Sequence, residues 1–259
     1  MTIVASVKVR DGIVLGTDSM TQITGVDSDG HAVFVKAYSN ARKLFSLGDA
    51  QVGVMTWGLG NLDQQSIEGV VLDFRRTALD ATASVGDIAQ QLYDFVKPKW
   101  QAAQQASDLG FCIAGYSSPD AAFAEVYEFV LPRDASAVVA SGADDFGLLW
   151  RGIDLPLIRL IKGVDPTLLA DLLAGGMPQP DVEALIAPRE WFLSQPGMPI
   201  QDAVNLVDYL LTTTIRTATF VDANPTCGGP LQVAAILPAT GFEWISHPRL
   251  ILPRDEVPT

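Results

Sequence analysis

The sequence predicts an α+β protein in which two β-sheets lie between outer helices. Three observations support this prediction. Strand patterns gather at both ends and in the middle of the chain, helical periodicity fills the stretches between them, and no repeat or low-complexity linker divides the 259 residues. A chain of this length with 48% hydrophobic residues can bury one large core. We therefore expect a single domain over residues 1–259.

The N-terminal part reads as a series of strands. Apolar and polar side chains alternate over residues 3–9, and the turn signal Arg10-Asp11-Gly12 separates this strand from a returning one at 13–18. The segment 23–41 is polar and partly Gly-rich, and it is longer than a tight connection requires. Further short strands are expected at 33–36, 44–47 and 52–56.

The remainder alternates between helices and strands. Apolar residues recur at helical spacing in three segments: 62–79, 86–103 and 200–217. The stretch 144–198 also reads as mostly helical, broken by Pro and Gly. Strands are expected between and after these helices, at 110–115, 123–130, 136–140, 231–237 and 242–246.

Composition excludes several classes of partner. The formal net charge is −13 and no basic stripe occurs, which argues against nucleic acid and anionic membranes. Cys112 and Cys227 lack CxxC spacing, which argues against a disulfide scaffold or a zinc site, and neither His31 nor His247 has a metal-motif companion. No signal-peptide pattern or membrane-length apolar run is present, so we expect a cytoplasmic protein without metal or cofactor.

The first hairpin places a carboxylate near the N-terminus. With a three-residue loop and Gly12 in the left-handed region, Val4 opposes Asp18, and Asp18 lies diagonally beside Thr2. A two-residue loop would move Asp18 to the opposite face of the hairpin, so this expectation depends on the loop.

An N-terminal threonine can carry its own base. Once Met1 is removed, the α-amine of Thr2 has a reference pKa near neutrality and can take the hydroxyl proton. A nearby lysine ammonium favours the neutral amine, and a buried lysine in turn needs a carboxylate partner. Such a site therefore requires Thr, Lys and Asp together, with backbone N–H groups facing the developing oxyanion.

Several segments resemble one known family in the right order. The opening TIVASVKVRDGIVLGTDS, from Thr2 to Asp18-Ser19, resembles that of proteasome β-subunits and their bacterial two-ring relatives. Asn40-Ala41-Arg42-Lys43-Leu44 resembles the segment with the catalytic lysine. Ile113–Tyr116 resembles the central strand of the family, and Ser141-Gly142 resembles its Ser-Gly element. Asp222 with Cys227-Gly228-Gly229 resembles the closing Asp-Gly-Gly element.

The resemblance implies a four-layer αββα sandwich of the N-terminal-nucleophile hydrolase type, with a helical insertion at about 150–198. It implies a threonine-type peptidase with a site formed by the nucleophile, its supporting groups and an oxyanion N–H: Thr2, Asp18, Lys43, Ser141, Asp222 and Gly58. It also implies stacked homo-oligomeric rings that enclose peptide or unfolded-protein substrates. Whether an ATP-driven unfoldase is a further partner stays open.

Departures from the family keep two alternatives open. Met20 stands where the peptidases usually have Arg, Trp57 or Gly58 aligns with the oxyanion glycine, and Cys227 replaces a serine. Ser141 also reads as an ordinary helix N-cap, and Lys43 alone as a solvated strand-end lysine. The alternatives are a non-catalytic proteasome-like shell protein and a small-molecule amidase with the same nucleophile.

Overall fold

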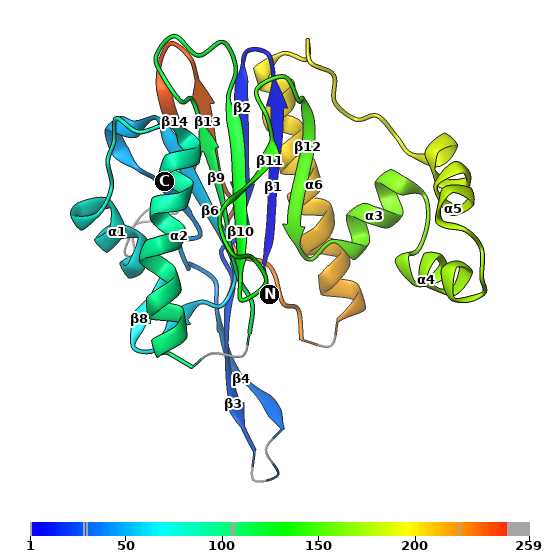
Figure 1. The fold of residues 1–259 in the computed structure, drawn as a ribbon. Helices are drawn as coiled ribbons and strands as arrows, with labels where there is room; N and C mark the ends of the chain where they lie inside the picture. The colour runs from blue at the N-terminus through cyan, green and yellow to red at the C-terminus, as the bar shows by residue number, and fades with distance from the viewer. Residues whose placement is uncertain (1, 28, 30, 105–106, 223, 248–259) are drawn as a thin grey trace, which may run out of the picture.

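Two five-stranded antiparallel sheets form the centre of the protein (Figure 1). The computed structural model describes residues 2–27, 29, 31–104, 107–222 and 224–247. The first sheet has the order β12-β1-β2-β13-β14, with bounds Gly147–Gly152, Ile3–Val9, Gly12–Thr17, Gln232–Leu237 and Gly241–Ser246. The second has the order β11-β10-β9-β6-β5, with bounds Val138–Ser141, Glu125–Leu131, Leu109–Gly115, Val52–Gly58 and Leu44–Ser46.

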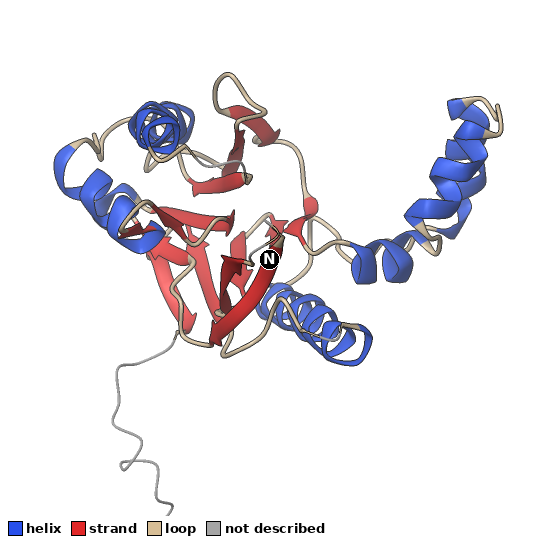
Figure 2. Cartoon of the chain, turned by 90° about the horizontal axis from the view of Figure 1, so that it is seen from below, coloured by secondary structure: helices blue, strands red, loops and turns tan. Residues whose placement is uncertain are grey.

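The two sheets pack face to face, with helices on their outer sides (Figure 2). Val4 and Leu15 from the first sheet meet Leu44 and Met55 from the second in a shared apolar cluster. The other face of the second sheet packs against α1 (Ile67–Thr77) and α2 (Val85–Ala102). The other face of the first packs against α6 (Ile200–Val221). Because β1 is covered on both faces, all seven of its residues are buried.

Three shorter helices form an arm that stands away from the sheets (Figure 2). They are α3 (Leu155–Lys162), α4 (Pro166–Ala174) and α5 (Gln179–Ile186), followed by the 3-10 turn η2 (Ala187–Arg189). Only α3 packs firmly, through Leu157 and Ile161 against α6. The helical expectation for 144–198 is wrong for β12, an edge strand that pairs with β1. No helix in the described ranges is long and apolar enough to cross a membrane.

A two-stranded hairpin projects beyond the sheets (Figure 1). It consists of β3 (Thr21–Val26) and β4 (Ala32–Tyr38), whereas the sequence predicted only a short strand at 33–36. β3 escaped prediction because Thr, Gln and Gly dilute its apolar pattern. Smaller elements are the 3-10 turn η1 (Gly48–Ala50) and the short pair β7 (Asn61–Leu62) and β8 (Gln65–Ser66).

The register of the first hairpin differs from the expected one. Val9 pairs with Gly12, so two residues connect β1 and β2 rather than three, and Val4 opposes Thr17 instead of Asp18. Asp18 lies just beyond the end of β2. It remains at the start of β1 because its backbone N–H donates to Ile3 O at 3.3 Å and its Oδ1 accepts from Ile3 N at 3.3 Å. The β1–β2 pairing thus continues to Ile3 and Asp18, and the hydrogen bond from Ile3 N orients the carboxylate.

Candidate active site

Thr2, Asp18 and Lys43 meet at one end of the paired sheets. Thr2 precedes β1, Asp18 follows β2 and Lys43 precedes β5, so three strand ends bring them together. Lys43 Nζ donates to Thr2 Oγ1 at 2.8 Å and to Asp18 Oδ1 at 2.9 Å. The three residues are 4%, 0% and 7% exposed. The structure thus joins a hydroxyl, an amine and a carboxylate that are distant in the sequence.

Asp18 is held by backbone donors as well as by Lys43. Its carboxylate accepts from the N–H groups of Ile3, Met20 and Gly228 at 3.3, 3.1 and 3.0 Å. Burial raises the pKa of Asp18, and the neighbouring Lys43, with the backbone N–H groups of Gly228 and Ile3, opposes that rise. A carboxylate with four donors has little rotational freedom, so it orients the Lys43 amine.

The backbone of Lys43 is held by Gln232, a residue that the sequence reasoning missed. Gln232 Oε1 accepts from Lys43 N and Leu44 N, both at 3.1 Å, and its Nε2 donates to Ala41 O at 2.7 Å. Gln232 is fully buried in β13. The available signal was an amide side chain in an otherwise apolar strand run, since a buried amide must find partners.

The chemical state of Lys43 differs from that of a surface lysine. Burial lowers the pKa of Lys43, and the Asp18 carboxylate opposes this effect. Its neutral form is therefore reached at a lower pH than for an exposed lysine. A neutral amine 2.8 Å from Thr2 Oγ1 can accept the hydroxyl proton directly.

Thr2 lines two adjoining cavities. Thr2, Lys43 and Gly58 line a cavity of ≈ 180 Å³. A larger cleft of ≈ 1020 Å³ opens beside it and also contains Thr2 and Gly58. A carbonyl group can thus approach Thr2 past the end of β6.

Gly58 ends β6 in a conformation that suits glycine. Its φ is +90°, and a Cβ at this position would overlap the carbonyl oxygen of Asp108. Its neighbour Leu59 donates its N–H to the same oxygen at 3.0 Å. The wall of the cleft therefore depends on close approach of two backbones.

We expect Gly58→Ala to lower the free energy of unfolding by about 2–4 kcal/mol, because it adds both backbone strain and a backbone clash. Urea denaturation followed by circular dichroism measures this change. Gly60→Ala is the matched control, since a Cβ there meets only the Thr21 hydroxyl and the backbone is not left-handed. Equal losses for the two variants would contradict the role assigned to the Gly58 conformation.

Ser141 and Asp222 do not join this cluster. Ser141 Oγ donates to Asp145 O at 3.1 Å, near Lys8, whose Nζ donates to Ala143 O at 2.9 Å. Lys8 lies on β1 six residues after Thr2, which places Ser141 about 20 Å from the nucleophile. Asp222 is exposed at the C-terminal cap of α6, and no side-chain hydrogen bond of Asp222 occurs within the described residues. The structure therefore brings neither residue into hydrogen-bonding contact with Thr2, contrary to the expected supporting roles.

Gly228, the first glycine of the pair that follows Asp222 in the sequence, does reach the site. Gly228 N donates to Asp18 Oδ2 at 3.0 Å, as described above. Its neighbour Cys227 is 1% exposed, and burial raises the pKa of its thiol to about 12. Cys227 is therefore a small buried residue and not a competing nucleophile.

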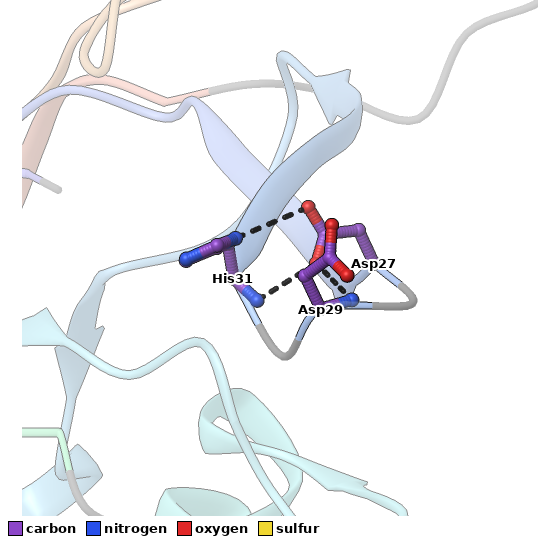
Figure 3. Close-up of side chains that lie close together, drawn as sticks. All are labelled: Asp27, Asp29 and His31. Carbon is purple, nitrogen blue, oxygen red and sulfur yellow. Dashed lines mark hydrogen bonds and ion pairs between the residues drawn. The ribbon is translucent and has the colours of Figure 1, made fainter.

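One group of potential metal ligands is found in the described part of the chain. Asp27, Asp29 and His31 lie at the turn between β3 and β4, with ligand atoms within 4.8 Å of one another (Figure 3). Asp27 Oδ1 accepts from the N–H groups of Asp29 and His31 at 2.9 and 2.8 Å. All three are exposed at the far end of the hairpin from Thr21, so a cation there would not touch the Thr2 cluster.

Comparisons with known proteins yield a structural likeness only. No family model and no curated protein matches the sequence. Solved structures that match along nearly the whole chain include an Anbu (Gly-1) mutant from Hyphomicrobium sp. strain MC1, and Anbu from Yersinia bercovieri, described as an ancestral beta-subunit. The chain shares the Anbu fold.

The first Anbu structure has a TM-score of 0.55 and 14% identity, covering 95% of this chain and 88% of its own. The second has a TM-score of 0.53 and 13% identity, covering 94% and 86%. At this identity the likeness to Anbu shows the fold and not the chemistry. It agrees with the expectation of an α+β protein with several antiparallel sheets.

Proposed function

We propose that this protein is a proteasome-like N-terminal-nucleophile hydrolase with the four-layer αββα arrangement, in which Thr2 attacks a peptide or amide carbonyl. The observation that carries the proposal is the contact of Lys43 Nζ with both Thr2 Oγ1 at 2.8 Å and Asp18 Oδ1 at 2.9 Å. A nucleophile, a base and a group that orients the base form a hydrogen-bonded series, and the nucleophile lines a cleft.

The reaction proceeds through an acyl-enzyme. Thr2 Oγ1 gives its proton to the neutral Lys43 amine, or to the α-amine freed by loss of Met1, and bonds to the carbonyl carbon. A backbone N–H in the Gly58 region donates to the oxyanion. The C–N bond then breaks, and the leaving amine departs with the transferred proton. Water hydrolyses the resulting ester and returns the Thr2 hydroxyl.

Covalent labelling tests the nucleophile. With a peptide epoxyketone or vinyl sulfone, we expect one adduct per chain on molecules that begin at Thr2, and none for Thr2→Ala. Intact-mass spectrometry measures both the adduct and the loss of Met1. Thr21→Ala is the matched control, because Thr21 lines the same cavities without contacting Lys43.

The cysteine thiols should not react with the electrophile, since burial raises the pKa of Cys112 and Cys227 to about 12. The proposal is refuted if Thr2→Ala labels as well as the unmodified sequence, or if every molecule retains Met1.

A non-catalytic shell protein is the second candidate. It is favoured by one observation, the absence of Ser141 and Asp222 from the cluster. Under either candidate we propose a cytoplasmic homo-oligomer with stacked rings. Under the catalytic one, the rings enclose peptide or unfolded-protein substrates, and an ATP-driven unfoldase is a compatible partner.

A further inference from the structure

The β3–β4 hairpin has one apolar face that is open to solvent. A Cβ on Gly25 would lie 3.1 Å from Val35 and 3.8 Å from Val33, so these two side chains share its face. Ile23 is two residues before Gly25 and therefore points the same way. Ile23, Val33 and Val35 are 47%, 38% and 59% exposed. An isolated two-stranded hairpin rarely carries such a face without a binding role.

This face continues into the cleft beside Thr2. Tyr38 pairs with Thr21, which is two residues before Ile23, so Tyr38 belongs to the same face. Lys36, which pairs with Ile23, is the one charged residue among the described residues of this face, and its Nζ lies 5.0 Å from the centre of the Tyr38 ring. Ile23 and Tyr38 both line the ≈ 1020 Å³ cleft that contains Thr2. The hairpin then extends away from the sheets (Figure 1). A ligand bound at Thr2 and continuing outward would lie along this face.

We propose that the apolar face of β3–β4, formed by Ile23, Val33, Val35 and Tyr38, binds the continuation of an unfolded polypeptide substrate whose apolar side chains recur at every second residue. This inference rests on the proposed function and deepens it, because it names the surface that holds the part of the substrate outside the cleft. The face spans about six residues of β4, or about 20 Å, with a β-bulge at Val35, and an extended segment laid along it presents every second side chain to the face.

The position of the apolar face indicates what kind of ligand binds there. Because the face begins inside the cleft, a folded partner or a second copy seated on it would cover the route to Thr2. An extended chain can occupy the face and the cleft together. The cleft also favours uncharged segments, since Asp108 is the one charged side chain among the described residues that line it.

Peptide binding to the full-length Thr2→Ala protein tests the proposal without turnover. Fluorescence anisotropy compares three labelled peptides at fixed salt: a twelve-residue peptide with alternating Val and Thr, one of the same composition with its valines consecutive, and a four-residue peptide that occupies the cleft alone. We expect the alternating peptide to bind most tightly. The double variant Val33→Thr, Val35→Thr should weaken its binding about tenfold and leave the short peptide unchanged, because the residues that line the cleft include neither valine.

Phe34→Thr is the matched control. Phe34 is 46% exposed on the same strand, but it pairs with Thr24 and so points to the opposite face. We expect it to leave all three affinities unchanged. Equal weakening by Phe34→Thr, or no weakening by the double variant, would overturn the proposal. So would a double variant that changes only the assembly mass in mass photometry, because the face would then join copies of the chain.

The two proposals can fail separately. Loss of selective binding with intact Thr2 labelling refutes the hairpin surface alone. Selective binding that persists although Thr2 takes no electrophile supports the surface and refutes the nucleophile.

Discussion

Replacing Lys43 by arginine should slow electrophile labelling of Thr2 by about 100- to 10,000-fold, the usual contribution of a general base. Arginine keeps a positive charge beside Asp18, so the ion pair survives, but a guanidinium does not deprotonate and cannot take the hydroxyl proton. The labelling rate is followed by intact-mass spectrometry over time.

Lys8→Arg is the control for this variant. Lys8 is the other buried lysine, 2% exposed, and its Nζ donates to the carbonyl oxygens of Gly142 and Ala143 at the far end of β1. We expect it to label at the rate of the unmodified sequence. Near-normal labelling of Lys43→Arg would show that Lys43 serves only to hold charge, with the α-amine as the sole base.

The same role predicts how labelling depends on pH. Only the neutral amine accepts a proton, so the rate should be low in acid and rise as pH passes through the pKa of the base. Burial lowers the pKa of Lys43, which places this rise below the range of an exposed lysine. In Lys43→Arg, the component of the rise that belongs to Lys43 should disappear.

Replacing Asp18 by alanine should lower the free energy of unfolding by about 3–5 kcal/mol, as for other broken buried ion pairs. The variant leaves the Lys43 ammonium buried without its partner, and it removes the acceptor of three backbone N–H groups. Urea denaturation at neutral pH measures the loss.

Two further variants sharpen this prediction. Asp222→Ala removes an exposed carboxylate and should change stability by less than about 0.5 kcal/mol. Asp18→Ala combined with Lys43→Met removes both charges and should recover part of the loss. If the double variant is no more stable than Asp18→Ala, the unpaired lysine is not the source of the instability.

Local pattern was enough to predict most elements. The helix expected at 86–103 is α2 (Val85–Ala102), and the strand expected at 110–115 is β9 (Leu109–Gly115). Both segments bury one or two continuous apolar faces, and such faces produce a regular spacing of apolar residues in the sequence. β12 was missed because its residues are half-exposed at a sheet edge and lie within a stretch rich in helical signals.

The site was predicted in part, and for a reason that the structure changes. Asp18 was expected beside Thr2 through a three-residue loop, yet the loop has two residues. The carboxylate still reaches its place because it lies beyond β2 and accepts hydrogen bonds from Ile3 and Gly228. The observed register places Asp18 opposite Ile3 and not opposite Val4, and the carboxylate reaches the cluster through these side-chain hydrogen bonds.

By itself the sequence determined the types of residue available and the strands that carry them: a threonine at the start of β1, an aspartate after β2 and a lysine before β5. Only the tertiary structure decided which residues meet. It brought Gln232 to the backbone of Lys43, left Ser141 at the other end of the sheet, and opened the apolar face of β3–β4 toward Thr2. These arrangements depend on contacts between segments that are distant in the sequence. Such contacts produce no periodic pattern of residues that a single sequence could reveal.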